Sequence, residues 1–301
     1  MKYGNFRYFR PPDDYDIGIR GGPILPGAIV NDPAVKQPLE PRPGRYALLY
    51  SPVTPTGQRL ALIAALGGFL DLIAVLSPNN GRLIQRSGDG SEEPSPAWAP
   101  MSGTEAAAFE WGTHVRLPAL VDLEAGRIIS NDPYLLPVKM VADLAEAAGR
   151  KEALALLREE EARLEWEARI FYDLHCGVYR AGFVARQDEY EREVERVYRF
   201  LADLDRHLAG RRFLLGEFPA LPDLWLYTLL VRYDQVYAPG FRLHKYRIRD
   251  FAEIHRYLRE LHAMPACRAT TDFALISRGY FLGIPALNRG IVPVGPDDHF
   301  L

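Results

Sequence analysis

The chain has 301 residues, of which 48% are hydrophobic and 25% charged, a composition typical of a soluble globular protein long enough for about two domains. Its 36 Lys and Arg and its 39 Asp and Glu give a formal net charge of −3. That balance supplies no broad basic surface and excludes nucleic acid and anionic membranes as expected partners. No apolar run approaches the ~18 residues that span a bilayer.

The cysteine and histidine content argues against disulfides and metal ions. Only Cys176 and Cys267 are present, too few for a disulfide framework, so we expect reduced thiols and a cytoplasmic protein. The seven histidines are scattered and form no metal motif, so we expect no metal site. The polar and aromatic residues 1–12 lack the apolar core of a secretory signal.

The first part of the chain indicates an α/β domain. Residues 1–44 are rich in Pro and Gly and predict an extended N-terminal arm, and the apolar run 46–50 predicts a buried strand. In the turn that follows, Thr54 can cap a helix and Pro55 suits its first turn, where the N–H that proline lacks has no partner. Further along we expect a helix, a strand, a loop-rich region, a hairpin and a helix, over residues 60–70, 72–76, 77–112, 115–130 and 135–148.

The second part of the chain is helical by pattern, after a linker expected at 149–151. Apolar residues recur every three to four positions among charged ones, which is typical of amphipathic helices. Helices are expected over residues 153–172, 187–209, 222–234 and 251–263. The apolar stripe of the second helix consists of Tyr190, Val194, Val197, Leu201, Leu204 and Leu208. The segment 222–234 is apolar enough to be central.

This order of elements predicts an α/β thioredoxin-like N-terminal domain with a mixed sheet, followed by an all-α C-terminal domain. The expected boundaries place the extended arm at 1–44, the thioredoxin-like domain at 45–150 and the all-α domain at 151–301.

Several stretches along the chain match one known family in order and spacing. They are 177–183 (Gly-Val-Tyr-Arg-Ala-Gly-Phe), 229–237 and 288–296, joined upstream by 43–46 and 116–118. In these stretches the chain resembles the glutathionyl-hydroquinone reductases, also called xi-class glutathione transferases. The resemblance implies the glutathione transferase fold, glutathione as the thiol ligand, a small aromatic substrate and a homodimer.

The nucleophile of that family is replaced in this chain. The family's strand-to-helix turn carries a cysteine and a tryptophan, and the resemblance aligns these positions with Thr54 and Thr56. A threonine cannot form the mixed disulfide through which the family cysteine reduces its substrate. Two interpretations of Thr54 stay open: its hydroxyl orients a bound thiolate and lowers the pKa of that thiol, or it only caps the helix together with Pro55.

The resemblance also implies where glutathione would bind. The residues concerned are Arg59, Leu117, the cis-proline position Pro118, Asn131 and Asp132. At the start of the helix after the hairpin the family has a Glu-Ser pair, whereas here Pro133 follows Asp132. Pro133 has neither a hydroxyl nor an N–H, so glutathione would lose up to two charge-assisted hydrogen bonds, worth roughly 1.5–3 kcal/mol each.

For the aromatic substrate, the resemblance implies a pocket lined by Tyr179, Tyr237 and Tyr280, with Arg180 beside them. Tyr179 and Tyr280 would donate hydrogen bonds to a developing oxyanion, while Tyr237, Arg180 and Thr56 would contact the substrate. Core packing is the alternative interpretation, because tyrosines also pack between helices.

Cys176 stands where the family has an asparagine, next to Gly177. If this segment faces the cleft, Cys176 would contact the substrate or act as a relocated nucleophile, with His175 as its base. The alternative is that Cys176 is a small buried hydrophobic residue, as lone helical cysteines usually are.

We therefore expect an atypical glutathione transferase-like enzyme that acts on an aromatic or quinone-like small molecule. With threonine at the nucleophile position, thiol conjugation, addition or isomerisation is expected rather than cysteine-dependent reductive deglutathionylation. The alternative is a thiol-independent enzyme, or a non-catalytic aromatic-ligand binding protein that uses the tyrosine-lined pocket.

Overall fold

The computed structural model describes residues 1–12, 29, 31–40, 42–79, 82–86, 92–93 and 117–295, which divide into two compact units. The sheet unit comprises Met1–Tyr8, Pro26–Arg158 and Pro265–Thr270, and the helical unit comprises Phe9–Leu25, Glu159–Met264 and Thr271–Leu301. Parts of the expected arm and of the expected loop 77–112, residues 115 and 116 of the expected hairpin, and residue 296 lie outside the described residues. The domain boundaries stay a prediction.

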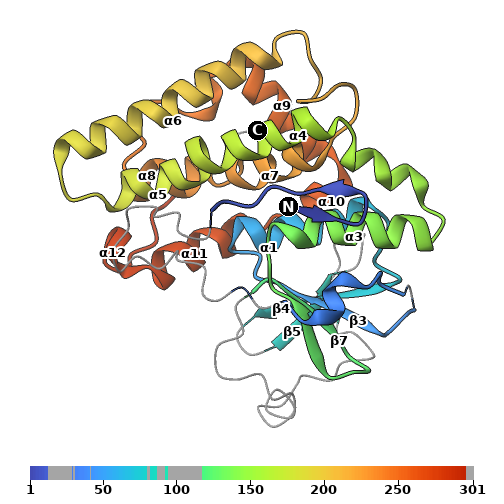
Figure 1. Cartoon of the computed structure of the whole chain (residues 1–301). Helices are drawn as coiled ribbons and strands as arrows, with labels where there is room; N and C mark the ends of the chain where they lie inside the picture. Colours follow the sequence, from blue (N-terminus) through green and yellow to red (C-terminus); the bar gives the residue numbers. More distant parts are fainter. Residues whose placement is uncertain are drawn as a thin grey trace. The chain divides into compact units, whose positions relative to one another are not determined.

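A six-stranded mixed sheet forms the centre of the sheet unit. Its elements are β3 (Tyr46–Leu49), α1 (Pro55–Leu66), β4 (Ile73–Asn79), β5 (Arg82–Arg86), β6 (Glu92–Glu93), β7 (Ala119–Asp122), β8 (Arg127–Ser130) and α3 (Leu135–Ala147). The strand order is β6-β5-β4-β3-β7-β8, with β3 parallel to β4 and antiparallel to β7. Helices α1 and α3 pack together beside the sheet (Figure 1). This is the mixed sheet expected of a thioredoxin-like domain.

The apolar runs that predicted strands at 46–50, 72–76 and 127–130 are strands. Their inward residues Ala47 of β3, Leu76 of β4 and Val121 of β7 form one buried cluster. Burial removes their apolar surface from water, which stabilises the sheet by about 25 cal/mol for each Å².

The expected cap of the first helix is confirmed, and two other expectations for this unit are wrong. Helix α1 begins at Pro55, directly after Thr54 as its cap predicted, but it ends at Leu66 before Gly67 rather than at residue 70. Its helical start follows from the cap, because the Thr54 hydroxyl accepts the Gly57 N–H at 3.2 Å. The region expected to be loop-rich contains β5, which pairs antiparallel with β4. Backbone pairing to a neighbouring strand holds its sequence Arg-Leu-Ile-Gln-Arg in place. The polar residues of this segment and the turn signals on either side do not indicate such pairing.

A buried ionic cluster ties the N-terminal arm to α3. The arm begins with a short hairpin of two strands, β1 (Lys2–Tyr3) and β2 (Phe6–Arg7). The Lys139 ammonium donates to Asp143 Oδ2 at 2.8 Å and to the Tyr3 hydroxyl at 2.6 Å. That hydroxyl donates to Asp143 at 2.7 Å, and the Leu39 N–H donates to Asp143 Oδ2 at 2.9 Å. Lys139 is fully buried, so its charge depends on these partners.

We expect Lys139→Met to destabilise the protein by about 3–5 kcal/mol, because it leaves the buried Asp143 carboxylate without its cation. The measurement is urea unfolding followed by circular dichroism. Lys151→Met is the matched control, since Lys151 is exposed and its loss should change the free energy of unfolding by less than about 0.5 kcal/mol. Equal losses for the two variants would show that the cluster contributes nothing.

The turn between β7 and β8 is organised by Asp122. Its Oδ1 accepts the N–H groups of Glu124 and Ala125, each at 3.1 Å, and its Oδ2 accepts from Arg45 at 3.1 Å. Burial of Asp122 acts to raise the pKa of its carboxyl, but the hydrogen bonds from Ala125 and Arg45 outweigh it and hold the pKa below the ordinary value of 3.8. The ionised form is therefore the one that the fold stabilises.

Because this pKa is lower in the folded than in the unfolded protein, the stability that Asp122 contributes is present above the unfolded value and is lost as pH falls through the folded one. We expect Asp122→Asn to cost about 1–2 kcal/mol at pH 7 and progressively less below about pH 4. Urea unfolding at pH 7 and pH 3 measures this difference. Glu124→Gln on the same turn is the control, and a penalty for Asp122→Asn that does not depend on pH would contradict the assignment.

The helical unit contains two helical runs that pass through π-helical turns. In chain order its elements are α4 (Glu160–Arg169), the π-helical η3 (Ile170–His175), α5 (Cys176–Phe183), α6 (Gln187–Leu208), α7 (Leu221–Leu230), the π-helical η4 (Tyr233–Tyr237), α8 (Ala238–Gly240), η5 (Ile248–Asp250), α9 (Ala252–Ala263), α11 (Phe273–Gly283) and α12 (Pro285–Asn288). Helix α6 packs against α5 and α9. All ten residues of α7 are buried, as expected for the central segment.

Two glycines of the motif 177–183 allow α5 to approach its neighbours closely. A Cβ on Gly177 would lie 2.8 Å from a methyl carbon of Val197 on α6, and a Cβ on Gly182 would lie 2.7 Å from the ring of Phe241. Any larger residue at these positions would force the neighbour to move. The motif is therefore explained in part by packing.

Several helical expectations are corrected by the structure. The expected helix 153–172 is divided into a 3₁₀ segment, η2 (Lys151–Leu157), and α4. Helices α10 (Pro265–Ala269, in the sheet unit), α11 and α12 were not expected, although Asp272 supplies a cap by accepting the Leu275 N–H at 2.8 Å. Tyr190 and Val194 are only half-buried, so the core stripe of α6 begins later than expected.

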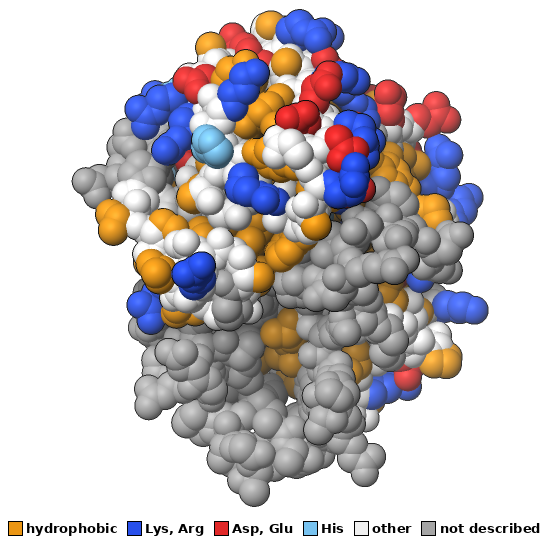
Figure 2. All heavy atoms as spheres, turned by 90° about the vertical axis from the view of Figure 1, so that its left-hand side faces the viewer, with side chains coloured by type: hydrophobic (Ala, Val, Ile, Leu, Met, Phe, Trp, Pro, Cys, Tyr) orange, Lys and Arg blue, Asp and Glu red, His pale blue; other side chains and the backbone are white. Residues whose placement is uncertain are grey.

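The surface carries charges of both signs. Figure 2 shows basic and acidic side chains interspersed with apolar ones over the described part of one face. Helix α6 illustrates the pattern, since Arg199 pairs with Glu195 at 2.7 Å and Arg192 with Asp188 at 3.4 Å. Within the ranges that the structure describes, no helix combines the length and apolar character needed to cross a bilayer.

Candidate functional site

The site residues of the sheet unit gather at one end of the sheet. The register pairs Leu49 of β3 with Ala119 of β7, so the turn after β3 and the segment before β7 meet at the same end. Leu120 pairs with Ser130, which brings the end of β8 and the start of α3 to that end too. Three turns separated by about eighty residues of chain are thus neighbours, because antiparallel pairing places strand ends beside strand starts.

Thr54 is bonded as a helix cap. Its hydroxyl donates to the Ser51 carbonyl at 3.2 Å and accepts from the Gly57 N–H at 3.2 Å. A Cβ on Gly57 would lie 2.8 Å from this hydroxyl, so the glycine keeps the turn tight. The proton of Thr54 is already donated, and a ligand would have to compete with Ser51 for it. Thr56, two residues on, is half-buried on α1.

The start of α3 is filled by the protein's own carboxylate. Asp132 is fully buried, and its Oδ1 accepts the N–H groups of Tyr134 at 2.9 Å and Leu135 at 3.1 Å. The Leu136 N–H donates to the Asp132 carbonyl at 3.0 Å, and Pro133 has no N–H. The backbone donors that would favour an anion at a helix start are therefore already bonded.

This arrangement does not fit a second carboxylate, such as the γ-glutamyl end of glutathione, at the α3 start. Arg59 is buried and donates to the Pro133 carbonyl, so it braces the same turn. Asn131 is also buried, beside Ser130, whose hydroxyl donates to Asn31 Oδ1 at 2.6 Å. Leu117 and Pro118 were expected to contact glutathione through their backbone. The peptide bond between them is cis, as the resemblance implied.

In the helical unit, three tyrosines from three separate elements converge. Tyr179 lies on α5, Tyr237 ends the π-helical η4, and Tyr280 lies on α11. The hydroxyls of Tyr179 and Tyr280 share a hydrogen bond of 2.7 Å. The ring of Tyr237 lies 6.2 Å from that of Tyr179 and 6.1 Å from that of Tyr280, centroid to centroid. The structure thus brings together the tyrosines that the motifs singled out.

The hydroxyl of Tyr237 differs from the other two. It is buried and makes no hydrogen bond of acceptable geometry to any described residue, although it lies next to Tyr179 and Tyr280. An unbonded buried hydroxyl costs free energy and calls for an explanation such as a catalytic role or an ordered water.

Burial keeps these phenols protonated. It raises the pKa of Tyr179 and of Tyr237 well above the ordinary value of 10, and the neighbouring Tyr280 raises both further, while the cation of Arg232 acts in the opposite direction. At neutral pH the two groups are therefore hydrogen-bond donors and not bases.

Two members of this cluster were missed by the sequence analysis. Phe241 is buried and stacks on Tyr237 with 5.4 Å between centroids and an interplanar angle of 11°. Arg232 is fully buried and donates to the Thr228 carbonyl. Phe241 stands four residues after Tyr237, a spacing that places both on one side of a helix, and a charged residue in the apolar segment 222–234 was the available signal for Arg232.

Arg180 is bonded within the helical unit, and Cys176 is a buried thiol. The Arg180 guanidinium donates to Glu193 at 2.7 Å and to the Tyr172 carbonyl at 2.7 Å, so it holds α5 to α6 and to η3. Cys176 is buried, and burial raises the pKa of its thiol to about 12. Cys267 is buried as well, and its pKa is raised to about 12 for the same reason.

We expect both cysteines to be unreactive in the folded protein at pH 7.5, since a thiol with a pKa near 12 is thiolate to well below one part in a thousand. The measurement is the rate of modification by a chromogenic disulfide, with and without 6 M guanidinium. Two thiols should react after unfolding and at least about a hundred times more slowly before it. Fast labelling of Cys176 alone in the native protein would restore the relocated nucleophile.

No group of three or more His, Cys, Asp or Glu side chains is arranged to hold a metal ion in the part of the chain that the structure describes.

Comparison with known proteins gives one consistent family. A family model of the glutathione S-transferase C-terminal domain matches residues 187–263. The chain is 32% identical over 184 residues to glutathionyl-hydroquinone reductase YqjG of Escherichia coli (strain K12), covering 60% of this chain and 56% of that relative, little more than half its length. It is 29% identical over 267 residues to glutathionyl-hydroquinone reductase PcpF of Sphingobium chlorophenolicum, covering 84% of this chain and 83% of that relative.

Solved structures support the same fold. The glutathione-S-transferase Xi from Phanerochaete chrysosporium superposes with a TM-score of 0.73 at 27% identity, covering 87% of this chain and 93% of that chain. The glutathione-bound structure of YqjG, a glutathione transferase homolog from Escherichia coli K-12, superposes with a TM-score of 0.71 at 25% identity, covering 85% and 86%. The fold expected from the sequence, a thioredoxin-like domain with an all-α domain, is confirmed.

Proposed function

We propose that the chain, which is similar to glutathionyl-hydroquinone reductases and contains a match to the glutathione S-transferase C-terminal domain, is an enzyme acting on an aromatic or quinone-like small molecule. The proposed reaction is thiol conjugation, addition or isomerisation rather than reductive deglutathionylation. The proposal rests on the cluster of Tyr179, Tyr237 and Tyr280, and on the absence of a reactive thiol among the described residues.

The reductive reaction is disfavoured by the groups present. A mixed disulfide needs a thiolate, and Thr54 has only a hydroxyl bonded to Ser51 and Gly57. Cys176 and Cys267 are buried thiols with pKa values raised to about 12, so neither substitutes for the family nucleophile.

The tyrosine cluster supports chemistry in which negative charge develops on a substrate oxygen. Protonated phenols held in place before the reaction stabilise such a charge without reorganising. The Tyr237 hydroxyl has a proton with no acceptor among the described residues, so a carbonyl oxygen reaching it would gain a hydrogen bond. In the Tyr179–Tyr280 pair one hydroxyl donates to the other, so the proton of the accepting hydroxyl is left as a second donor, and the nearby Arg232 cation adds positive potential.

The start of α3 favours a second candidate, a thiol-independent enzyme or a non-catalytic carrier of aromatic ligands. Asp132 already accepts the N–H groups of Tyr134 and Leu135, and a second carboxylate beside it would be repelled. Both candidates use the tyrosine cluster, so they differ in whether glutathione binds at all. Together with the first candidate, the thiol-dependent enzyme, we propose that the protein is a homodimer located in the cytoplasm.

Glutathione binding separates the two candidates. In calorimetry at millimolar ligand, a dissociation constant at or below about 1 mM, worth ~4 kcal/mol, supports a thiol-dependent reaction and justifies assays with quinones. No detectable heat would contradict glutathione dependence and direct the search to thiol-free turnover or ligand carriage. Thr54→Val tests the hydroxyl separately, since it should abolish a thiol-dependent rate if Thr54 orients the sulfur.

We expect Tyr237→Phe to lower kcat on an accepted quinone by about 10²–10³-fold, the usual cost of removing one oxyanion donor. The substitution should leave stability unchanged, because the hydroxyl makes no hydrogen bond in the described structure. Steady-state kinetics and thermal unfolding measure the two effects. Tyr8→Phe is the matched control in the sheet unit, where the Tyr8 hydroxyl contacts Met1 Sδ at 3.3 Å. Unchanged kcat in Tyr237→Phe would rule the cluster out of catalysis.

A further inference from the structure

Helix α6 carries two apolar stripes, of which only one belongs to the core. Val197, Leu201, Leu204 and Leu208 are completely buried. Tyr190, Val194, Tyr198 and Ala202 recur at every fourth position, and none of them is buried. Residues four apart lie one above another on a helix, so this second stripe forms a continuous line that the folding core does not require.

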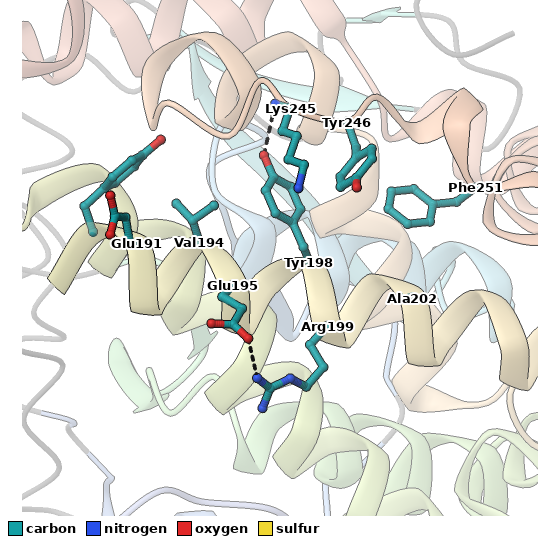
Figure 3. A pocket seen from close by; sticks show the side chains of 10 residues that line it. Glu191, Val194, Glu195, Tyr198, Arg199, Ala202, Lys245, Tyr246 and Phe251 are labelled. Atoms are coloured by element: carbon teal, nitrogen blue, oxygen red, sulfur yellow. Dashed lines mark hydrogen bonds and ion pairs between the residues drawn. The ribbon is translucent and has the colours of Figure 1, made fainter. Parts of the chain in front are cut away.

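The second stripe lines one wall of a surface cavity of about 460 Å³. The opposite wall comes from the segment before α9, where Lys245, Tyr246 and Phe251 face α6 (Figure 3). The cavity lies within the helical unit and shares no lining residue with the cluster of Tyr179, Tyr237 and Tyr280. Its volume falls in the range of ~300–1,000 Å³ that is common for small-molecule sites.

Three aromatic rings form one end of this cavity. Tyr198 and Tyr246 meet edge to face with 5.0 Å between centroids and an interplanar angle of 86°, and Tyr246 meets Phe251 at 5.6 Å and 65°. The Lys245 N–H donates to the Tyr198 hydroxyl at 3.0 Å, which fixes the segment against α6. All three rings are only half-buried, so apolar ring surface stays available to a flat molecule.

The charge at this end is positive and unbalanced. The Lys245 ammonium lies 5.0 Å from the Tyr246 ring centroid and 6.0 Å from that of Tyr198, and it has no carboxylate partner within the described ranges. At the other end Arg199 pairs with Glu195 at 2.7 Å, and the carboxylate of Glu191 also lines the cavity, so the positive charge is confined to the Lys245 end. The protein's own ammonium group thus already lies beside these rings. Its charge disfavours a cationic ligand at this end and favours an anionic one.

We propose that this cavity binds a flat aromatic molecule that carries one carboxylate. The aromatic part lies against Tyr246 and Phe251, and the carboxylate pairs with the Lys245 ammonium. Val194 and Ala202 supply the apolar floor. The site is separate from the tyrosine cluster of the proposed function and does not depend on it.

The test uses the full-length protein and 2-naphthoate as the probe, with binding followed by calorimetry and by saturation-transfer NMR. Saturable binding is expected, and Lys245→Gln should weaken it about fivefold or more because the charge-assisted contact is lost. The matched control Lys151→Gln removes an exposed lysine of the sheet unit and should leave the affinity unchanged. The cationic analogue 2-naphthylmethylamine should bind more weakly than the naphthoate.

Location is tested by photolabelling with 4-azidobenzoate and mass spectrometry. Labels are expected on peptides spanning 190–202 and 245–251, and Tyr246→Ala should reduce them in a protein that still folds by circular dichroism. Labels on the peptides of Tyr179 and Tyr280, or equal affinity in Lys245→Gln and the parent, would overturn the proposal.

Two further measurements separate this site from the proposed function and from an interface between copies of the chain. Lys245→Gln should retain whatever quinone activity the parent has, so loss of naphthoate binding with intact activity separates this site from the proposed function. If naphthoate does not bind and Tyr246→Ala instead converts a dimer to a monomer in sedimentation, the face is an interface between copies of the chain and the ligand proposal is overturned.

Discussion

The backbone pairing of β3 with β7 is the constraint on which the sheet unit depends. Pairing Leu49 with Ala119 puts the Thr54 turn beside cis-Pro118, and the β7–β8 hairpin then brings Asp132 to the same end. The local sequences of these three turns do not favour contact between them. They meet because a strand can exchange its hydrogen bonds in only one register when its apolar face must stay buried.

At that sheet end, the protein's own side chains cap the starts of two helices. Thr54 closes the first turn of α1, and Asp132 closes the first turn of α3. Each supplies an oxygen to backbone N–H groups that would otherwise lack a partner. The same donors cannot serve a ligand without losing a cap, typically worth about 1 kcal/mol. A ligand that binds at either helix start would therefore compete with the stability of that helix.

The helical unit holds its polar groups in a different way. Its three clustered tyrosines and Arg232 are buried, and so are all ten residues of α7, which precedes Arg232 in the chain. Two of the three tyrosines follow or end a π-helical turn, and such turns change the direction in which the next side chains point. Gly182 then admits the Phe241 ring, which stacks on Tyr237. Burial raises the pKa values of Tyr179 and Tyr237, so these two phenols are donors at neutral pH. Helix α6 adds an aromatic cavity whose lining residues are separate from this cluster.

The sequence by itself determined the fold class, most strands and the main amphipathic helices, because apolar periodicity and caps such as Thr54–Pro55 act locally. It also singled out the three tyrosines, through motifs rather than through geometry. Tertiary structure alone decided that β5 is a strand, that Tyr190 and Val194 line a cavity instead of the core, and that Phe241 and Arg232 join the cluster. It also decided that Cys176 is a buried thiol. These outcomes depend on packing against other elements, which local sequence does not record, whereas the Asp132 cap at the α3 start is local because its partners are the N–H groups of Tyr134 and Leu135.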